Sequence, residues 1–342
     1  MPRRRYMNWN PRGETLAVVR QAIDICNAYQ AQGFDLTLRQ LYYQFVARDL
    51  IPNNEKSYKR LGNIVADARL AGFLDWEHIV DRTRNLEEES HWNNPAHIIR
   101  AVASQYREDK WAEQDTYVEV WIEKDALKGV LESVCPDEDV PYFSCRGYTS
   151  ASEIWGAAQR LGEKIGKGKN VVIIHLGDHD PSGIDMSRDI EDRLRMFIAQ
   201  DAGLVGYDEY DSADDLKWAY EEATEDFLTI DRIALNHDQV LAYNPPPNPA
   251  KLTDARADEY VRRFGPNSWE LDALDPATLV NLIRTSIESY KDADVWQEAV
   301  DHEASQRETL RLVHENWDEV VEGLGVEMND GDHDEDDDDQ AD

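Results

Sequence analysis

The chain has 342 residues, enough for more than one domain, and 41% of them are hydrophobic, which fits a folded protein rather than a disordered one. No apolar run approaches the ~20 residues that a membrane-spanning helix needs, so we expect no membrane association. The three cysteines never occur as C-x-x-C, which excludes a disulfide framework or a zinc ribbon and predicts a cytoplasmic protein.

Three predicted helices and a hairpin occupy the first part of the chain. The helices span about 14–32, 37–49 and 55–71, and two short extended pieces follow in the run FLDWEHIVDRTR. This order is typical of a winged helix-turn-helix domain, which we assign to residues 1–90. A helical protein-interaction domain is the alternative. The third helix and the wing carry basic side chains suited to phosphate contacts, namely Lys56, Lys59, Arg60, Arg69, Arg82 and Arg84.

The pattern changes after a linker at 91–112, which contains one predicted helix. Strands alternate with helices over residues 113–245, and such alternation predicts an α/β domain with a parallel sheet. The nearly apolar run VVIIHL is typical of a central strand covered on both faces. We expect a helical region at 246–325 and a disordered acidic tail at 326–342. The helices of that region are predicted at about 251–264, 276–290 and 296–322.

Three carboxylates follow two of the predicted strands. Glu123 comes directly after YVEVWI, and Asp178 and Asp180 lie in the turn GDHDPSG after VVIIHL. Because ligands of open parallel sheets bind at the carboxyl ends of the strands, we expect these side chains to converge. Hard carboxylate oxygens at this spacing suit Mg²⁺, and Glu123 is either a third ligand or a general acid. His175 and His179 flank the turn and leave a transition metal as the alternative.

The segments WIEKDALKGVLE and IIHLGDHDPSGIDM resemble a TOPRIM domain, the Mg²⁺-binding module of topoisomerases, bacterial primases and some nucleases. The E-K-D-A run and the D-x-D-P-x-G turn are most similar to the A subunit of DNA topoisomerase VI and its meiotic break-forming relatives. That family has a second signature, R-x-x-[YF]-Y, in a winged-helix domain whose last tyrosine attacks DNA. This chain has Arg39-Gln40-Leu41-Tyr42-Tyr43 in the predicted second helix.

Helical spacing gives a separate interpretation of the same residues. The apolar stripe of this helix runs through Leu38, Leu41, Tyr42, Phe45 and Val46, so we expect Tyr42 to be buried. Tyr43 lies off the stripe, on the face that it shares with Arg39. We therefore predict an exposed Tyr43 as the nucleophile, with Arg39 as the cation beside it. A surface tyrosine without a catalytic role is the alternative.

The resemblance implies a transesterification. Tyr43 would attack a phosphate of double-stranded DNA and form a 5′-phosphotyrosyl link, with Mg²⁺ on Asp178 and Asp180 and with help from Glu123. In the family the tyrosine meets the metal of the other chain in a homodimer, and strand passage requires a separate ATPase subunit. The chain has no G-x-x-x-x-G-K-[ST] motif of its own. The alternatives are a TOPRIM nuclease that uses water, and a DNA-binding scaffold or regulator whose active site has lapsed.

A net charge of −34 argues against a nucleic-acid partner, but the charge is unevenly distributed. Residues 1–85 hold 13 basic and 9 acidic side chains, whereas the last fourteen residues hold nine acids and no base. We therefore expect DNA binding to depend on the N-terminal domain. Only 11 of the 36 basic residues are lysine, and an acidic surface poor in lysine predicts a halophilic protein.

Overall fold

The chain forms two compact units. The computed structural model describes residues 5–80, 91–145, 147, 149–206, 208–251 and 253–325. The first unit comprises Met1–Asn85 and Asp115–Lys291, and the second comprises Leu86–Gln114 and Asp292–Asp342. The helix predicted within the linker and the last predicted helix thus belong to the same unit, which the sequence pattern did not indicate.

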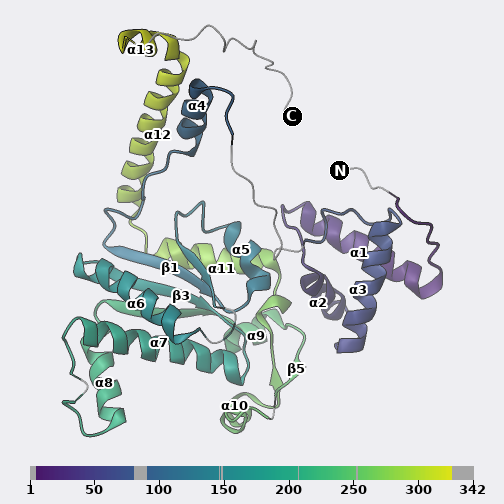
Figure 1. Ribbon diagram of the computed structural model, residues 1–342. Helices are drawn as coiled ribbons and strands as arrows, with labels where there is room; N and C mark the ends of the chain where they lie inside the picture. Colours follow the sequence, from purple (N-terminus) through teal and green to yellow (C-terminus); the bar gives the residue numbers. More distant parts are fainter. Residues whose placement is uncertain are drawn as a thin grey trace. The chain divides into compact units, whose positions relative to one another are not determined.

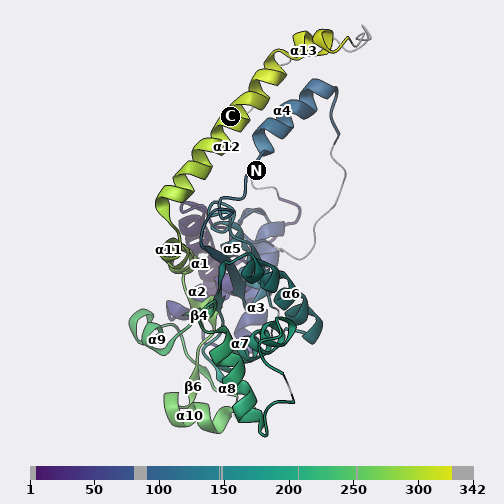
Figure 2. The same cartoon turned by 90° about the vertical axis from the view of Figure 1, so that its left-hand side faces the viewer.

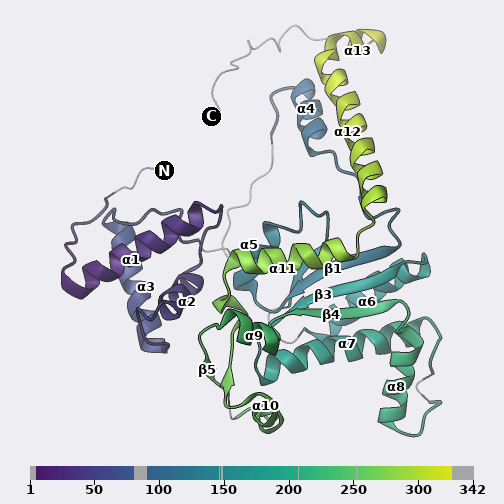
Figure 3. The same cartoon turned by 180° about the vertical axis from the view of Figure 1, so that it is seen from behind.

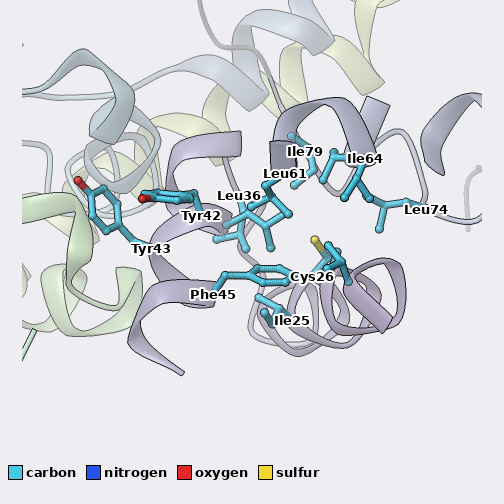
Figure 4. Close-up of a cluster of buried hydrophobic side chains, with 14 of the residues drawn as sticks. Ile25, Cys26, Leu36, Tyr42, Tyr43, Phe45, Leu61, Ile64, Leu74 and Ile79 are labelled. Atoms are coloured by element: carbon cyan, nitrogen blue, oxygen red, sulfur yellow. The ribbon is translucent and has the colours of Figure 1, made fainter. Parts of the chain in front are cut away.

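The N-terminal part of the first unit contains the three predicted helices, α1 (Gly13–Gln30), α2 (Leu38–Ala47) and α3 (Glu55–Leu70). Helix α2 begins at a capping box. The Thr37 hydroxyl accepts a hydrogen bond from the Gln40 backbone N–H, and the Gln40 side-chain oxygen accepts one from the Thr37 backbone N–H. The three helices share a buried apolar cluster (Figure 4). Ile79 pairs with Leu36 in an isolated parallel bridge, and Arg82 and Arg84 of the predicted wing lie outside the described residues.

A four-stranded parallel sheet forms the centre of the first unit and confirms the predicted α/β class (Figure 1). The strand order is β2-β1-β3-β4. The strands are β1 (Thr116–Ile122), β2 (Tyr142–Ser144), β3 (Asn170–Leu176) and β4 (Leu228–Ala234). The predicted central strand VVIIHL is β3, whose neighbours are β1 and β4, and all six of its residues are buried.

Helices cover both faces of this sheet. Two long helices, α6 (Ala151–Gly166) and α7 (Pro181–Asp201), pack on one face against Tyr117, Trp121 and Ile173. Helix α11 (Pro276–Ser289) lies on the opposite face (Figures 1 and 3). Shorter helices surround this core, namely η1 (Asp125–Leu127), α5 (Lys128–Glu132), α8 (Ala213–Thr224) and α9 (His237–Tyr243).

The segment between β4 and α11 returns to the carboxyl end of the sheet. It contains the antiparallel pair β5 (Asn248–Pro249) and β6 (Asn267–Ser268), which flanks α10 (Ala257–Phe264), and it ends in η2 (Leu271–Ala273). Helix α10 is shorter than the predicted helix at 251–264. A further bridge joins Trp269 to His179, so this segment is attached directly to the turn after β3.

The second unit is a helical pair. Helix α4 (Pro95–Gln105) lies beside α12 (Ala293–Glu315), and α13 (Trp317–Gly323) follows (Figure 2). Glu303 joins the two segments, because its carboxylate accepts from Lys110 Nζ at 2.8 Å and from Glu108 N at 2.9 Å. Within the described part of the chain, no helix combines the length and the apolar character that crossing a membrane requires.

Candidate active site

The carboxylate turn lies where β1 and β3 end side by side. Ile122 is in register with Leu176, so the residues that follow each strand are neighbours. Glu123 N donates to Leu176 O at 2.9 Å, and Asp178 N donates to Glu123 Oε2 at 2.8 Å. Two of the three residues with predicted site carboxylates are therefore in direct contact, through the Asp178 backbone N–H and the Glu123 carboxylate, as the neighbouring strand ends of a parallel sheet allow.

Asp180 has a second task in this turn. It is the N-cap of α7, and its Oδ1 accepts from Gly183 N at 2.6 Å and from Ser182 Oγ at 2.9 Å. Pro181 occupies the first helical position, where its missing N–H costs nothing. The D-x-D-P-x-G sequence thus builds a capped helix start as well as presenting carboxylates.

Burial controls the ionisation of the two central carboxylates. It raises the pKa of Asp178 to about 7, and the charge of Glu123 acts in the same direction, against Lys124. Burial also raises the pKa of Glu123, and Asp180 adds to that rise. These hard oxygen donors fit Mg²⁺ in kind, because a cation would relieve the repulsion between them. Among the described residues, however, no three Asp, Glu, His or Cys side chains are already arranged around one metal position.

Tyr43 is buried, so the prediction that it is exposed is wrong. Its side chain belongs to the apolar cluster of the N-terminal helices, and 4% of the residue is accessible. It lies at the edge of that cluster (Figure 4). Ala273 of η2 is also a member of the cluster. The apolar stripe of α2 faces the neighbouring N-terminal helices, whereas the face with Arg39 and Tyr43 is covered by η2, which is far away in the sequence. Tyr42 is buried, as predicted.

Arg39 lies beside Tyr43, as predicted, but it is bound to two acids. Its guanidinium carbon is 5.9 Å from the centre of the Tyr43 ring. Arg39 Nε is 2.8 Å from Asp272 Oδ2, and the guanidinium also forms an ion pair with Glu270. Burial and the carboxylates of Asp272 and Glu270 raise the pKa of the Tyr43 hydroxyl well above its usual range, and Arg39 opposes this rise only in part.

Lys124 is a site residue that the sequence interpretation missed. Its Nζ lies 2.8 Å from Glu270 Oε2, 3.0 Å from Asp272 Oδ1 and 3.0 Å from Asp178 Oδ2. Although burial opposes its charge, these acids raise the pKa of Lys124 above its ordinary value. In return, Lys124 and Arg39 outweigh the effect of burial on Glu270 and lower its pKa to about 2. The available signal was the position of Lys124 directly after Glu123, within E-K-D-A.

Most of these side chains line one pocket. It has a volume of about 580 Å³. The candidate site residues in its wall are Arg39, Tyr43, Lys124, Asp178, Asp180 and Glu270. The structure therefore brings the predicted tyrosine and two of the predicted carboxylates to a single cavity, and Glu123 contacts Asp178 next to it.

The four side chains of α3 that were predicted to bind DNA have different surroundings. Lys56 is exposed. Lys59 pairs with Glu55 at 2.6 Å, and Arg60 pairs with Glu14 at 2.9 Å. The Arg69 guanidinium stacks on Trp76, 4.5 Å from the ring centre, and donates to its carbonyl. Arg69 is thus engaged within the domain, and the three exposed side chains remain candidates for phosphate contacts.

Arg232 of β4 is a second missed residue, because it holds the backbone of the carboxylate turn. Its guanidinium donates to the carbonyls of Asp178 at 2.7 Å, Gly177 at 3.1 Å and Gly183 at 3.1 Å, and to Ser187 Oγ. Burial lowers the pKa of Arg232, while the nearby carboxylates of Glu123 and Asp178 favour its charge. It was not predicted from the sequence, because an arginine within a strand belongs to no recognisable motif.

Gly183 is required by the close approach of α7 to this turn. A Cβ atom there would lie 2.3 Å from Asp178 O and 3.1 Å from Glu123 Oε2. We expect Gly183→Ala to lower the free energy of unfolding by ~1–3 kcal/mol and to displace Asp178, as overpacking does elsewhere. Urea unfolding measures the first effect. Gly162→Ala in α6 is the matched control, because nothing lies within 4 Å of its Cβ, and it should be neutral or stabilising. Equal stability of the two variants would contradict this account.

Two histidines near the turn serve the fold. His175 is buried inside β3, as predicted, with Nδ1 2.9 Å from Ser187 Oγ. His179 Nδ1 is 2.7 Å from the Tyr260 hydroxyl, and its ring packs among Tyr260, Phe264 and Trp269. Burial lowers the pKa of His175 to about 3 and that of His179 to about 4.

The neutral state of His175 predicts a pH dependence of stability. Its pKa is about 3 in the folded chain and about 6.5 in the unfolded chain, so below pH 6.5 the unfolded state binds more protons. The free energy of unfolding should therefore fall by about 1.5 kcal/mol between pH 6.5 and 5 through this group. Urea unfolding at both values measures it. His175→Asn should remove this part of the slope, whereas the exposed control His91→Asn should retain it. An unchanged slope in His175→Asn would contradict the assignment.

Comparison with known proteins adds no family assignment. No protein-family model matches the sequence, and a search of the curated proteins finds no match.

Proposed function

We propose that the protein is a Mg²⁺-dependent DNA-cleaving transesterase of the topoisomerase VI A type, with an N-terminal winged-helix domain and a TOPRIM domain. The observation that carries the proposal is the single pocket whose wall contains Tyr43, Arg39, Asp178 and Asp180. These residues come from the two sequence signatures that are widely separated in the chain. Double-stranded DNA is the substrate, a homodimer supplies one cut per strand, and a separate ATPase subunit is the partner for strand passage.

The reaction exchanges one phosphoester for another. The Tyr43 oxygen forms a bond to phosphorus while the bond from phosphorus to the DNA O3′ breaks, which leaves a 5′-phosphotyrosyl link and a free 3′-hydroxyl. The phenol gives its proton to solvent water that reaches the pocket lined by Tyr43, and the leaving O3′ must gain a proton from a general acid. Glu123 is suited to the second transfer, because burial raises its pKa and favours its protonated form.

The side chains around the phosphate have separate tasks. Arg39 and Lys124 supply positive charge for the phosphate oxygens, and Arg232 keeps the carboxylate turn in place. Asp178 and Asp180 would hold Mg²⁺, which supplies Lewis-acid stabilisation of the developing charge when bound, and a role of Glu123 as third ligand is the alternative to its role as the acid. The pKa of Tyr43 is raised in the free protein, so its phenol keeps its proton there. The DNA phosphate, with the cations that bind it, must therefore be in place before the phenol loses its proton.

Incubation with supercoiled DNA and Mg²⁺ or Mn²⁺ at high salt, followed by denaturant and protease treatment, tests the proposal. We expect a covalent DNA–protein adduct that depends on metal and disappears in Tyr43→Phe. Tyr220→Phe is the control, because it removes a buried hydroxyl in α8, outside the pocket. No adduct with the wild-type protein under any of these conditions overturns the proposal.

A nuclease that uses water is the second candidate, and the burial of Tyr43 favours it. Here the carboxylate turn would activate water, and cleavage would leave free ends. Cleavage that persists in Tyr43→Phe and produces no adduct would establish this alternative. DNA binding without cleavage would instead indicate a scaffold or regulator whose site has lapsed, consistent with the ion pairs that already occupy Arg39 and Lys124.

A further inference from the structure

Lys251, which follows β5, is an exposed lysine beside the carboxylate turn. The chain has 70 acidic side chains for 36 basic ones, so a cation on its surface readily finds a carboxylate partner. Among the residues that the structure describes, the exposed lysines with neither an ion pair nor a ring contact are Lys56, Lys167 and Lys251. Of these three, Lys251 is the one that lines the pocket of the carboxylate turn.

The other cations in the wall of this pocket are already shared with acids. Arg39 and Lys124 each form ion pairs with two acids of the segment 270–272. Because their charge is balanced in the free protein, they offer an incoming phosphate little net attraction. Lys251 has no such partner among the described residues, so its charge is available to an anion that enters the pocket.

Backbone hydrogen bonds fix the segment that contains Lys251 to the carboxylate turn. Ala250 N donates to Pro266 O at 2.9 Å, next to the pairing of β5 with β6, and this closes the segment that contains α10. Trp269 and His179 exchange two backbone hydrogen bonds, of 2.8 and 2.9 Å. The position of Lys251 relative to the turn is therefore set by the backbone.

Helix α10 is held by aromatic side chains and ends in exposed arginines. The Tyr260 hydroxyl is 2.7 Å from His179 Nδ1, and the Phe264 ring centre is 4.7 Å from that of His179. Arg263 is exposed, and its guanidinium carbon is 5.1 Å from the centre of the Phe264 ring. Unlike the preceding arginine, it forms no ion pair with any described residue. It lies just before the junction with Lys251, so the two free cations belong to the same part of the segment.

We infer that Lys251 and Arg263 form a phosphate-binding edge that receives the DNA backbone beside the cleaved phosphate, with Lys251 inside the pocket and Arg263 outside it. Flexible cations without base-reading partners contact phosphates and select no sequence, so the ligand is the sugar–phosphate backbone. This inference rests on the proposed function for the identity of the anion. It concerns only the carboxylate turn and the segment bonded to it, so it holds whichever chain of a dimer supplies the tyrosine.

The phosphate-binding edge would let an acidic surface accept DNA. The carboxylates of Asp178 and Asp180 line the same pocket as Lys251 and repel a phosphate. A free cation beside them offsets part of that repulsion and draws the backbone into the pocket. Contacts of this kind release counterions from DNA, so each one adds to the salt dependence of binding.

DNA binding in EDTA, without any metal, tests the inference. The Kd of a fluorescently labelled duplex is measured by anisotropy over the salt range in which circular dichroism shows each variant folded. In Lys251→Gln the slope of log K against log salt should decrease by ~0.9, the contribution of one phosphate contact. The ratio of variant to wild-type Kd should then grow about fourfold for every fivefold dilution of the salt, equally on duplexes of unrelated sequence. Arg263→Gln should have the same effect, and the double variant should lose ~1.8.

The matched control is Lys167→Gln. Lys167 is also exposed and lacks an ion pair among the described residues, but it lies before β3, at the opposite end of the sheet from the carboxylate turn. It removes the same charge, so an effect of net charge alone would appear in both variants. Lys251→Arg keeps the charge and should bind as the wild type does. An unchanged slope in Lys251→Gln or Arg263→Gln, or an equal decrease in Lys167→Gln, would overturn the inference.

The adduct assay separates this inference from the proposed function. A wild type that forms the metal-dependent adduct, together with a Lys251→Gln variant that binds DNA unchanged, would overturn the phosphate-binding edge and leave the transesterase standing. A wild type that binds DNA without cleaving it, together with the expected loss of slope in Lys251→Gln, would support the edge and contradict the transesterase.

Discussion

Lys124→Met is expected to lower the free energy of unfolding by ~3–5 kcal/mol, because it removes a buried cation and leaves its carboxylate partners without compensation. Lys124 Nζ is within 3.0 Å of oxygens of Asp178, Glu270 and Asp272. Methionine keeps the length and most of the apolar volume of the side chain, so the loss reports the charge. Urea unfolding at high salt and pH 7.5 measures the change.

The matched control is Lys128→Met, one helical turn later. The Lys128 side chain is 46% exposed, and it pairs only across the surface with Glu132 at 3.3 Å. Exposed pairs of this kind contribute ~0–1 kcal/mol, so this variant should unfold close to the wild type. If both variants lose the same stability, the ion pairs of Lys124 with Asp178, Glu270 and Asp272 do not act as a buried network. We also expect Lys124→Met to lower the free energy of unfolding by less at pH 5 than at pH 7.5. The pKa of Asp178 is raised to about 7, so this partner of Lys124 is neutral at pH 5.

The sheet could be predicted because its signals are local. A buried parallel strand needs a run of apolar residues, and VVIIHL has no other good interpretation. The register of β1 and β3 then follows from the topology and brings Glu123 to Asp178. The convergence of these carboxylates was thus available from sequence, through a rule about strand ends rather than through any contact.

The ion pairs that Glu270 and Asp272 form with Arg39 and Lys124 could not be predicted in this way. Glu270 is 146 residues from Lys124 and 231 from Arg39, and W-E-L-D is not a recognisable motif. The same missing information explains the error at Tyr43. A helical stripe identifies the face that packs on sequence neighbours, but α2 is covered on its second face by η2. An amphipathic pattern reports the strongest face of a helix and says nothing of a second, more polar contact.

The interior of the second unit was missed for a related reason. Its two helices, α4 and α12, come from segments on either side of the sheet domain in the sequence, and no local pattern indicates that they pack together. The burial of Glu303 is explained by its contacts with Lys110 Nζ and Glu108 N, which are distant in the sequence. Charged residues that pair across long separations look like ordinary surface residues in the sequence.

Arg232→Met should lower the free energy of unfolding by ~3 kcal/mol or more, because three backbone carbonyls of the carboxylate turn would lose their hydrogen-bond donor in a largely buried site. The arginine also sets the position of Asp178, so the variant should lose any stabilisation by Mg²⁺. For the wild type this stabilisation is expected to reach ~2.7 kcal/mol at a free metal concentration 100 times the Kd. Thermal unfolding with and without Mg²⁺ measures both effects.

The control for this variant is Arg188→Met on α7. Arg188 is 55% exposed and pairs with Asp185 and Asp192 on its own helix, so it should cost less than ~1 kcal/mol and leave the metal response intact. Loss of stability with an unchanged response to Mg²⁺ in Arg232→Met would show that the metal does not use the turn that Arg232 holds. The proposed ligands Asp178 and Asp180 would then be wrong. A response that disappears in Arg232→Met and persists in Arg188→Met would instead link the cation to the turn after β3, because those two arginines differ in what they hold rather than in charge.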